Sequence, residues 1–306
     1  MILTAAVWAV GLAAGIALQR RVPRPQRLTH ILFLATFWVT SPLMVFFAYT
    51  TLALDTGLLA AMTLVVASSW LVLALGFGAA RLAGSGPAER GSMVLGAGLG
   101  NTGIVGFPLA AAVFGPPGLA LAVVYSEFQF LIPVLAVSTG VARRFAGPGA
   151  CAPGAPDLRT LLRSWVVNPP VAAGVLAVAL RLAGADLREA VEPLGSAAAL
   201  AIGLFGFVQV GLAAPLERVA HTLADLGRAG LTLALRCGAT PLALLGLGWV
   251  TGVDVPGAFL LLAATPVAFH TIVLARVYDL DGALLRLLVA VSTPAVIAAV
   301  LLWQAL

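Results

Sequence analysis

The sequence predicts an all-α integral membrane protein with ten transmembrane helices, and three observations support this. Of the 306 residues, 61% are hydrophobic and only 9% are charged, with a mean hydropathy of +1.07. A soluble domain usually carries about 25% charged residues. Most apolar residues fall into runs of about 20, the length that a helix needs to cross the hydrocarbon core of a bilayer. The loops between these runs hold nearly all of the arginines.

Ten predicted spans follow one another along the chain. They cover residues 2–19, 29–51, 57–80, 91–114, 118–141, 161–183, 190–212, 228–250, 257–277 and 284–305. Four arginines follow the first span and no basic residue precedes it, so we expect a transmembrane helix there and not a cleaved signal peptide. Asp55 precedes the third span and Asn168 lies near the start of the sixth, and both residue types favour helix N-caps.

Loop arginines predict how the chain is oriented. The loops after odd-numbered spans contain 14 arginines, and those after even-numbered spans contain only Arg181 and Arg188. Because cytoplasmic loops carry an excess of basic residues, we expect the odd-numbered loops to be cytoplasmic and both termini to lie outside. The longest loop, 142–160, is rich in Gly, Pro and Ala and is expected to be a flexible cytoplasmic linker. The sequence thus predicts a protein of the plasma or inner membrane.

Three weak internal matches predict a duplicated chain. The Ala-Ala-Gly at 13–15 recurs 159 residues later, Pro108 corresponds to Pro266 at an offset of 158, and Pro133 corresponds to Pro294 at an offset of 161. Five spans in each half would force the halves into opposite orientations, as in the inverted repeats of many secondary transporters. We expect repeats at 1–141 and 161–306, joined by the linker 142–160.

The segment GLGNTGIVGFPLA at 98–110 breaks the helical pattern of the fourth span. It contains four glycines, an asparagine and Pro108, and the ninth span contains the corresponding Pro266. Non-helical backbone at membrane depth is tolerated only where protein buries it or a watery cavity adjoins it. We therefore expect two broken helices that cross and turn their positive N-terminal ends toward an anion. The alternative is that the glycines only let helices pack closely.

Several polar and proline-containing segments lie at the expected breaks and helix ends. They are NTGIVGFPL at 101–109 with Phe114-Gly115, Asn168-Pro169-Pro170, Leu235-Arg236 followed by Pro241, and Thr265-Pro266 with ARVY at 275–278. In this order they resemble motifs of the auxin efflux carrier family, which contains plant PIN-FORMED carriers and bacterial organic-acid permeases. The resemblance covers nearly the whole chain.

The resemblance implies an architecture like that of NhaA and the bile-acid symporters. In it, the scaffold helices would be 1–51 and 161–212, and the transport helices 57–141 and 228–305. It also implies elevator-type alternating access and a homodimer. Asn101 would lie at the crossover and help to hold the substrate carboxylate.

Candidate substrate-binding residues surround the expected crossover. They are Asn101, Thr102, Pro108, Pro266 and Gln209. The Asn101 amide can donate and accept hydrogen bonds without a permanent charge, or it can simply cap a broken half-helix. Gln209 could face the cavity from the seventh span.

Three ionisable residues within spans are candidates for coupling or for electrostatic roles. A charge at membrane depth is costly, so Glu127 should be paired, protonated or in contact with water. It is a candidate proton carrier, a partner for Arg236, or a residue at a cavity mouth. Arg236 could also attract the anion or hold backbone carbonyls at the break in the ninth span. His270 could couple protons or form a local hydrogen bond.

These residues predict a secondary carrier that moves a small organic anion, auxin-like or malate-like, in the direction of efflux. The alternative is a sodium-coupled organic-anion symporter or a cation/proton antiporter of the same architecture; a pore or a structural membrane protein is a further alternative. The spans contain no cluster with metal-ligand spacing and the chain no phosphate-binding loop, so we expect neither an enzyme nor a cofactor, but coupling to H⁺ or Na⁺ stays open. A nucleic-acid partner is not expected, because the basic residues are loop arginines.

Overall fold

The computed structural model describes residues 2–53, 55–129, 138–150, 168–213 and 222–305. Helices account for most of these residues, and the only β-type feature among them is one isolated bridge. Among the described residues, seven helical stretches are long and apolar enough to cross a membrane: 3–21, 27–51, 56–82, 102–129, 188–212, 223–251 and 282–304. The predicted all-α class is therefore confirmed for the described residues, and their composition fits an integral membrane protein.

The other expected spans take different forms. The fourth and fifth follow each other within the stretch 102–129 and are separated at Gly115, whose non-helical backbone (φ 67°, ψ −163°) lies at the expected boundary between residues 114 and 118. The sixth is a shorter apolar helix, Pro169–Leu182, and its expected beginning at 161–167 lies outside the described residues. The ninth is split into two short helices. Pro133 and most of the linker 142–160 also lie outside the described residues, and the ten-helix inverted repeat stays a prediction.

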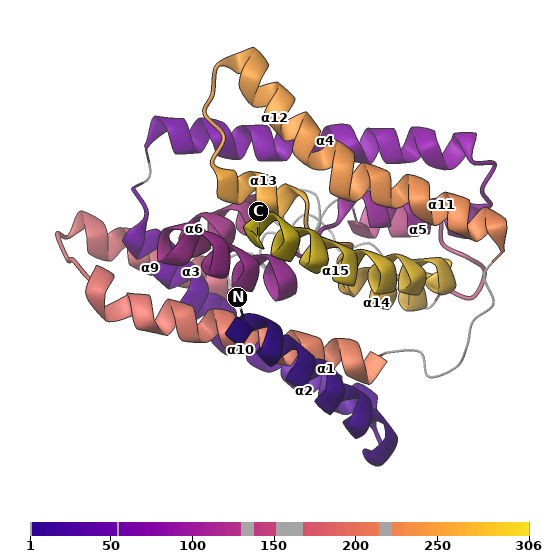
Figure 1. Cartoon of the computed structure of the whole chain (residues 1–306), viewed down its shortest axis with the longest axis horizontal. Coiled ribbons are helices and arrows are strands. Elements are labelled where there is room, and N and C mark those ends of the chain that lie inside the picture. The colour runs from indigo at the N-terminus through magenta and orange to yellow at the C-terminus, as the bar shows by residue number, and fades with distance from the viewer. Residues whose placement is uncertain (1, 54, 130–137, 151–167, 214–221, 306) are drawn as a thin grey trace. The chain divides into compact units, whose positions relative to one another are not determined.

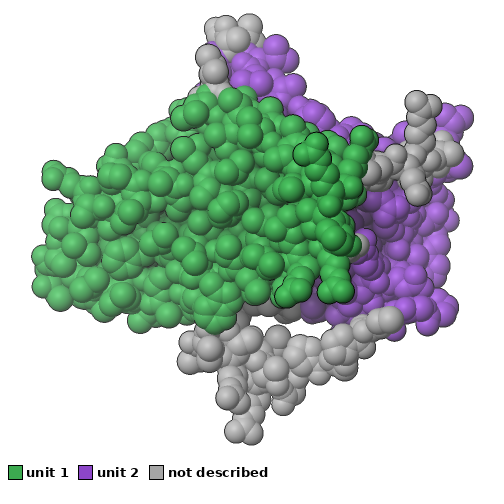
Figure 2. All heavy atoms as spheres, turned by 90° about the horizontal axis from the view of Figure 1, so that it is seen from below, with its two compact units in different colours: residues 1–54, 103–124, 154–214 green, residues 55–102, 125–153, 215–306 purple. Residues whose placement is uncertain are grey.

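The described chain divides by its internal contacts into two units (Figure 2). Unit 1 comprises residues 1–54, 103–124 and 154–214, and unit 2 comprises 55–102, 125–153 and 215–306.

Figure 1 labels most of the α-helices. Unit 1 contains α1 (Ile2–Arg21), α2 (Pro25–Ala35), the π-helix η1 (Thr36–Thr40), α3 (Ser41–Thr51), α9 (Pro169–Leu182) and α10 (Arg188–Ala213). Unit 2 contains α4 (Thr56–Leu82), α5 (Pro87–Gly98), α7 (Thr139–Arg144), α11 (Leu223–Leu233), the π-helix η4 (Ala234–Ala239), α12 (Thr240–Thr251), α13 (Gly257–Ala263), α14 (His270–Tyr278) and α15 (Gly282–Ala305). The π-helix η2 (Thr102–Gly106) and α6 (Phe107–Gln129) have residues in both units.

Unit 1 is built on two helix pairs, α1 with α10 and α3 with α9. The backbones of α1 and α10 approach most closely at Gly15 and Gly211, where a Cβ added to either glycine would lie 2.8 Å from the Cα of the other. Small residues allow such close packing between apolar helices. Trp8 stacks on Phe207 across the same pair at 5.2 Å.

Unit 2 is built around α5. All of its residues from Gly91 to Gly98 are buried, and it packs against α4, α11 and α15. A helix that is apolar and buried on every side is a core helix, so α5 places the residues that follow Gly98 in the interior of unit 2.

Prolines explain the three π-helices among the described residues. η1, η2 and η4 each end two residues before a proline, at Pro42, Pro108 and Pro241 respectively. A proline ring clashes with the carbonyl four residues before it and removes one helical donor. That carbonyl lies within the π-helix in all three cases, so the wider turn accommodates the clash.

Two expected N-caps differ in outcome. The Asp55 carboxylate accepts the Leu58 N–H at 2.7 Å, as an N-cap should. Asn168 occupies the N-cap position of α9, but its side chain forms no capping hydrogen bond, so the expected side-chain cap is wrong. Pro169 and Pro170 follow it, and the helix start has fewer N–H groups to cap because prolines have none.

Candidate functional site

Two segments of unit 2 lose their helical winding, one in each half of the chain. α5 ends at Gly98, and residues 99–101 are non-helical before η2 begins at Thr102. α13 ends at Ala263, and α14 begins only at His270. Both interruptions predicted for the fourth and ninth spans are therefore present in the structure.

The two interrupted segments pair through their backbones in an antiparallel bridge centred on Gly100. The Asn101 N–H donates to the Pro266 carbonyl at 2.7 Å, and the Ala268 N–H donates to the Leu99 carbonyl at 2.9 Å. Buried peptide groups need hydrogen-bond partners, above all where water cannot reach them. Each break thus satisfies backbone groups of the other.

A buried arginine holds the second break. Arg236 lies in η4 and is 1% exposed. Its Nε donates to the Thr265 carbonyl at 3.0 Å and its Nη2 donates to the Ala263 carbonyl at 2.9 Å. The last carbonyls of a helix lack helical partners and carry the negative end of its dipole. The guanidinium therefore supplies hydrogen bonds and positive charge to these carbonyls. Of the roles considered for Arg236, this is the one of holding backbone carbonyls at the break in the ninth span.

Gly100 leaves room for that arginine. A Cβ added there would collide with the Arg236 guanidinium and would lie 2.7 Å from the Thr265 hydroxyl. Gly103 in the same segment differs, because nothing lies within 4 Å of a Cβ added at that residue.

A serine from a later helical segment holds each break. Thr102 Oγ1 lies 2.7 Å from Ser126 Oγ on α6. The Val267 N–H donates to Ser292 Oγ on α15 at 3.1 Å, and the Ser292 hydroxyl donates to the Leu288 carbonyl at 2.7 Å. The serines follow their partners by 24 and 25 residues. This similar spacing is expected if the two halves are repeats in which equivalent serines stabilise equivalent breaks.

Further polar side chains of unit 2 are buried near the breaks. Asn101 and Thr102 are each 6% exposed. Tyr125 is fully buried and close enough to Arg236 to interact with its charge. Gln129, one helical turn after Tyr125, is buried on the same face of α6. The site thus combines one cation with several uncharged hydrogen-bonding groups, a composition that suits an anion.

The structure brings four predicted site residues together in unit 2. Asn101, Thr102, Pro266 and Arg236 all lie in or against the paired breaks. Two further predicted residues, Pro108 and Gln209, belong to unit 1. Pro108 lies near Gly203 of α10, and Gln209 is buried on the same helix.

The remaining two predicted residues, Glu127 and His270, also lie in unit 2. Glu127 is half-buried on α6. Within the described ranges, the only ion pairs are formed by Arg228, so the ion pair with Arg236, one of the three roles considered for Glu127, does not form there. His270 is the first residue of α14 and is half-buried, and its Nε2 has no hydrogen-bond partner among the described residues.

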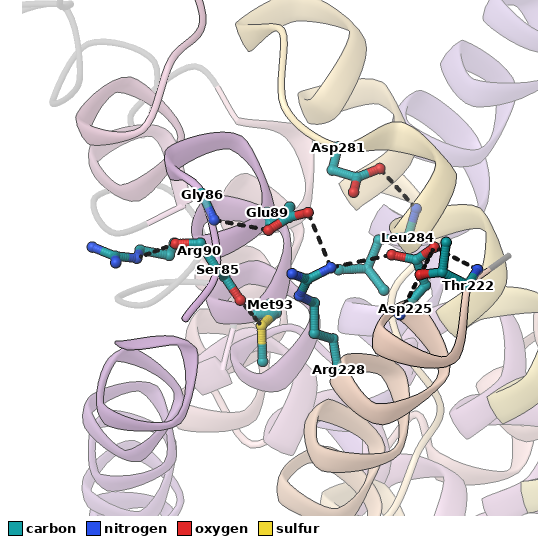
Figure 3. Close-up of polar contacts among 10 residues, drawn as sticks. All are labelled: Ser85, Gly86, Glu89, Arg90, Met93, Thr222, Asp225, Arg228, Asp281 and Leu284. Atoms are coloured by element: carbon teal, nitrogen blue, oxygen red, sulfur yellow. Dashed lines mark hydrogen bonds and ion pairs between the residues drawn. The ribbon is translucent and has the colours of Figure 1, made fainter. Parts of the chain in front are cut away.

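A second polar cluster joins α11 to the beginning of α5 (Figure 3). Arg228 Nη1 lies 3.1 Å from a Glu89 oxygen and 3.2 Å from an Asp225 oxygen. Glu89 and Asp225 also accept N–H groups at the starts of their own helices, at Gly86 and Thr222. Acidic groups stabilise helix N-termini, so this cluster is explained by helix capping and by attachment of α11 to α5.

Sequence reasoning missed several of the residues that shape the site. They are Tyr125, Ser126, Thr265 and Ser292. A serine or tyrosine in an apolar span is common, and its structural role can be recognised only from its partner on another helix. The one available signal was the position of Thr265 directly before Pro266.

A scan against models of protein families gives no match, and no curated protein matches the sequence significantly.

Proposed function

We propose that this chain is a secondary carrier that moves a small organic anion, a mono- or dicarboxylate, across the plasma or inner membrane. The observation that carries the proposal is the backbone pairing of two interrupted helices beside a buried arginine. Interrupted helices from the two halves of a chain mark the substrate sites of many secondary transporters. Helices that only anchor a protein have no need of such breaks, because unwound backbone is costly in lipid.

The charge around the paired breaks favours an anionic substrate. The partners given for Arg236 are carbonyl and hydroxyl oxygens, which stabilise its charge without cancelling it. The helices that begin at Thr102 and His270 add the positive ends of their dipoles. A carboxylate beside Asn101 would offset this charge and accept a hydrogen bond from the side-chain amide.

The contacts within unit 1 support the proposed inverted repeats, 1–141 and 161–306. The first span, α1, packs against the seventh, α10, and the sixth span, α9, packs against the second, α3. Gly15 faces α10, and its counterpart Gly174 faces α3. The first helix of each proposed repeat thus contacts the second helix of the other.

We also propose that the chain is a member of the auxin efflux carrier family, on the strength of its motifs, and that it works as an elevator in a homodimer. Asn101 would bind the carboxylate. From the arginine bias, the termini would lie outside and the loop 142–160 in the cytoplasm.

Counterflow in proteoliposomes tests the function. Vesicles holding the purified protein would be preloaded with unlabelled malate, pyruvate or indole-3-acetate and given a trace of the same compound with a radioactive label. We expect transient, saturable accumulation of at least one label. Asn101→Ala should abolish it while the protein still melts cooperatively. Asn168→Ala is the matched control, since the same side chain is lost at a helix start in unit 1 where it forms no cap, and it should transport normally.

Two results would contradict the proposal. Flux that rises linearly with concentration and shows no counterflow would indicate a pore. Wild-type counterflow by Asn101→Ala would show that the amide does not bind substrate. Repeating the assay with an imposed pH gradient, and separately with a sodium gradient, would identify the coupling ion.

A further inference from the structure

The end of α13 forms a compact group of four oxygen atoms around the Arg236 guanidinium. They are the carbonyl oxygens of Leu262, Ala263 and Thr265 and the Thr265 hydroxyl oxygen, at 3.4, 2.9, 3.0 and 3.4 Å from the guanidinium nitrogens. We call these four atoms the oxygen cradle. The Thr265 hydroxyl also donates to the Leu262 carbonyl at 2.7 Å, which fixes its lone pairs toward the arginine.

The cradle has the chemistry of a site for a small cation. Uncharged carbonyl and hydroxyl oxygens are the ligands with which proteins replace the hydration shells of alkali ions. The end of a broken helix adds the negative end of a dipole, and unwound carbonyls at such ends coordinate Na⁺ in transporters with interrupted helices. In this chain a guanidinium already occupies the position.

The fit of the arginine is supported by the opposite segment. Gly100 borders the guanidinium so closely that any Cβ would overlap it. Arg236 is 1% exposed, and the ion pairs of the described residues do not include it. The charge is therefore stabilised by the uncharged oxygens of the cradle, and the side chain lies between the two breaks.

We propose that Arg236 is a built-in cation: its guanidinium fills the oxygen cradle in place of a dissociable ion and stabilises the break between α13 and α14. As a consequence, which rests on the proposed function, Na⁺ does not drive transport by binding at this position. The occupancy of the cradle itself does not depend on what the protein carries.

Chemical rescue tests the cradle without any transport assay. Thermal unfolding of purified wild type and Arg236→Ala would be followed in choline chloride, with part of the salt replaced by millimolar guanidinium, NaCl or KCl at constant ionic strength. We expect Arg236→Ala to melt well below wild type in choline and to regain much of the difference, saturably, with guanidinium. Adding Thr265→Val removes one cradle oxygen and should raise the guanidinium concentration for half rescue about tenfold, the factor that corresponds to one hydrogen bond to a charged group.

The outcomes separate clearly. Saturable rescue by guanidinium or by an alkali ion, weakened by Thr265→Val, supports the cradle. A folded Arg236→Ala protein that none of these cations stabilises overturns it. If Arg236→Ala does not fold, wild type and Thr265→Val decide: Na⁺-specific stabilisation of wild type that Thr265→Val abolishes would place the ion in the cradle and refute the proposal, and equal melting of wild type in Na⁺ and choline would support it.

A transport arm distinguishes this inference from the proposed function. Counterflow of the best substrate should be equal in Na⁺ and in choline. If no carboxylate is transported at all, the proposed function fails while the melting data still decide whether the cradle holds a cation.

Discussion

Gly100→Ala adds a single methyl group to the point where the two interrupted segments meet. Its carbon would overlap the Arg236 guanidinium and lie 2.7 Å from the Thr265 hydroxyl oxygen. Neither group can move away freely, because Arg236 is held by the cradle and Thr265 by its hydrogen bond to the Leu262 carbonyl. The methyl group must therefore displace the arginine or separate the two segments.

The cost follows from these two contacts. Overpacking of a well-filled interior costs about 1–3 kcal/mol. If Nη2 leaves the Ala263 carbonyl, from which it now lies 2.9 Å, the loss of a hydrogen bond to a charged group adds about 1.5–3 kcal/mol. We expect Gly100→Ala to lower the free energy of unfolding by about 2.5–6 kcal/mol, and the melting temperature by on the order of 10 °C.

Gly103→Ala is the matched control in the same glycine-rich segment. Nothing lies within 4 Å of its added Cβ, and alanine favours helical backbone over glycine by up to about 1 kcal/mol. Melting of the detergent-purified variants would be compared side by side, and Gly103→Ala should melt at or slightly above the wild-type temperature.

A double-mutant cycle identifies the collision partner. In an Arg236→Ala background the guanidinium is gone, so the penalty of Gly100→Ala should fall by more than half. Equal penalties in both backgrounds, or a Gly100→Ala protein as stable as wild type, would refute the position assigned to Arg236.

Three other predictions concern single contacts. Ser292→Ala leaves the buried Val267 N–H without its acceptor and should cost about 1–3 kcal/mol of unfolding free energy; Ser292→Thr keeps a hydroxyl and should recover most of it, and equal melting of both variants would contradict the contact. Glu127→Gln should abolish any pH dependence of counterflow if this carboxyl carries the coupling proton, whereas an unchanged pH profile would exclude it. Arg228→Ala removes a partly exposed ion pair with Asp225 and Glu89 and should cost only about 0–1 kcal/mol, so a collapse in stability would show that the cluster does more than cap helices.

Composition and the positions of glycine and proline were sufficient for the all-α class and for the two breaks. The breaks could be predicted because glycine and proline act locally, through missing side chains and missing N–H groups, and such effects are visible in a single segment. The N-cap at Asp55 was predictable for the same reason. The limit between the fourth and fifth spans, expected between residues 114 and 118, was also predictable, since Gly115 breaks the helical backbone there.

The contacts at the breaks could not be predicted in the same way. Ser292 contacts a residue 25 positions away and Arg236 contacts one 29 positions away, and nothing in the local sequence specifies those partners. An ion pair between Arg236 and Glu127 was a reasonable expectation from charge alone. Helix-end carbonyls are an alternative partner that charge counting overlooks, because their partial charges belong to the backbone.

The position of Pro241 bears on where Arg236 points. A π-turn holds about one residue more than the α-turn it replaces, and each residue of an α-helix advances about 100° around the axis. If Pro241→Ala let η4 relax to α-helical pitch, the side chains before it would swing by that angle relative to α12. The direction of the Arg236 guanidinium toward α13 would then depend on the ring of Pro241, five residues further along the chain. A substitution that contacts neither break would thereby abolish the function of the site by displacing its buried cation.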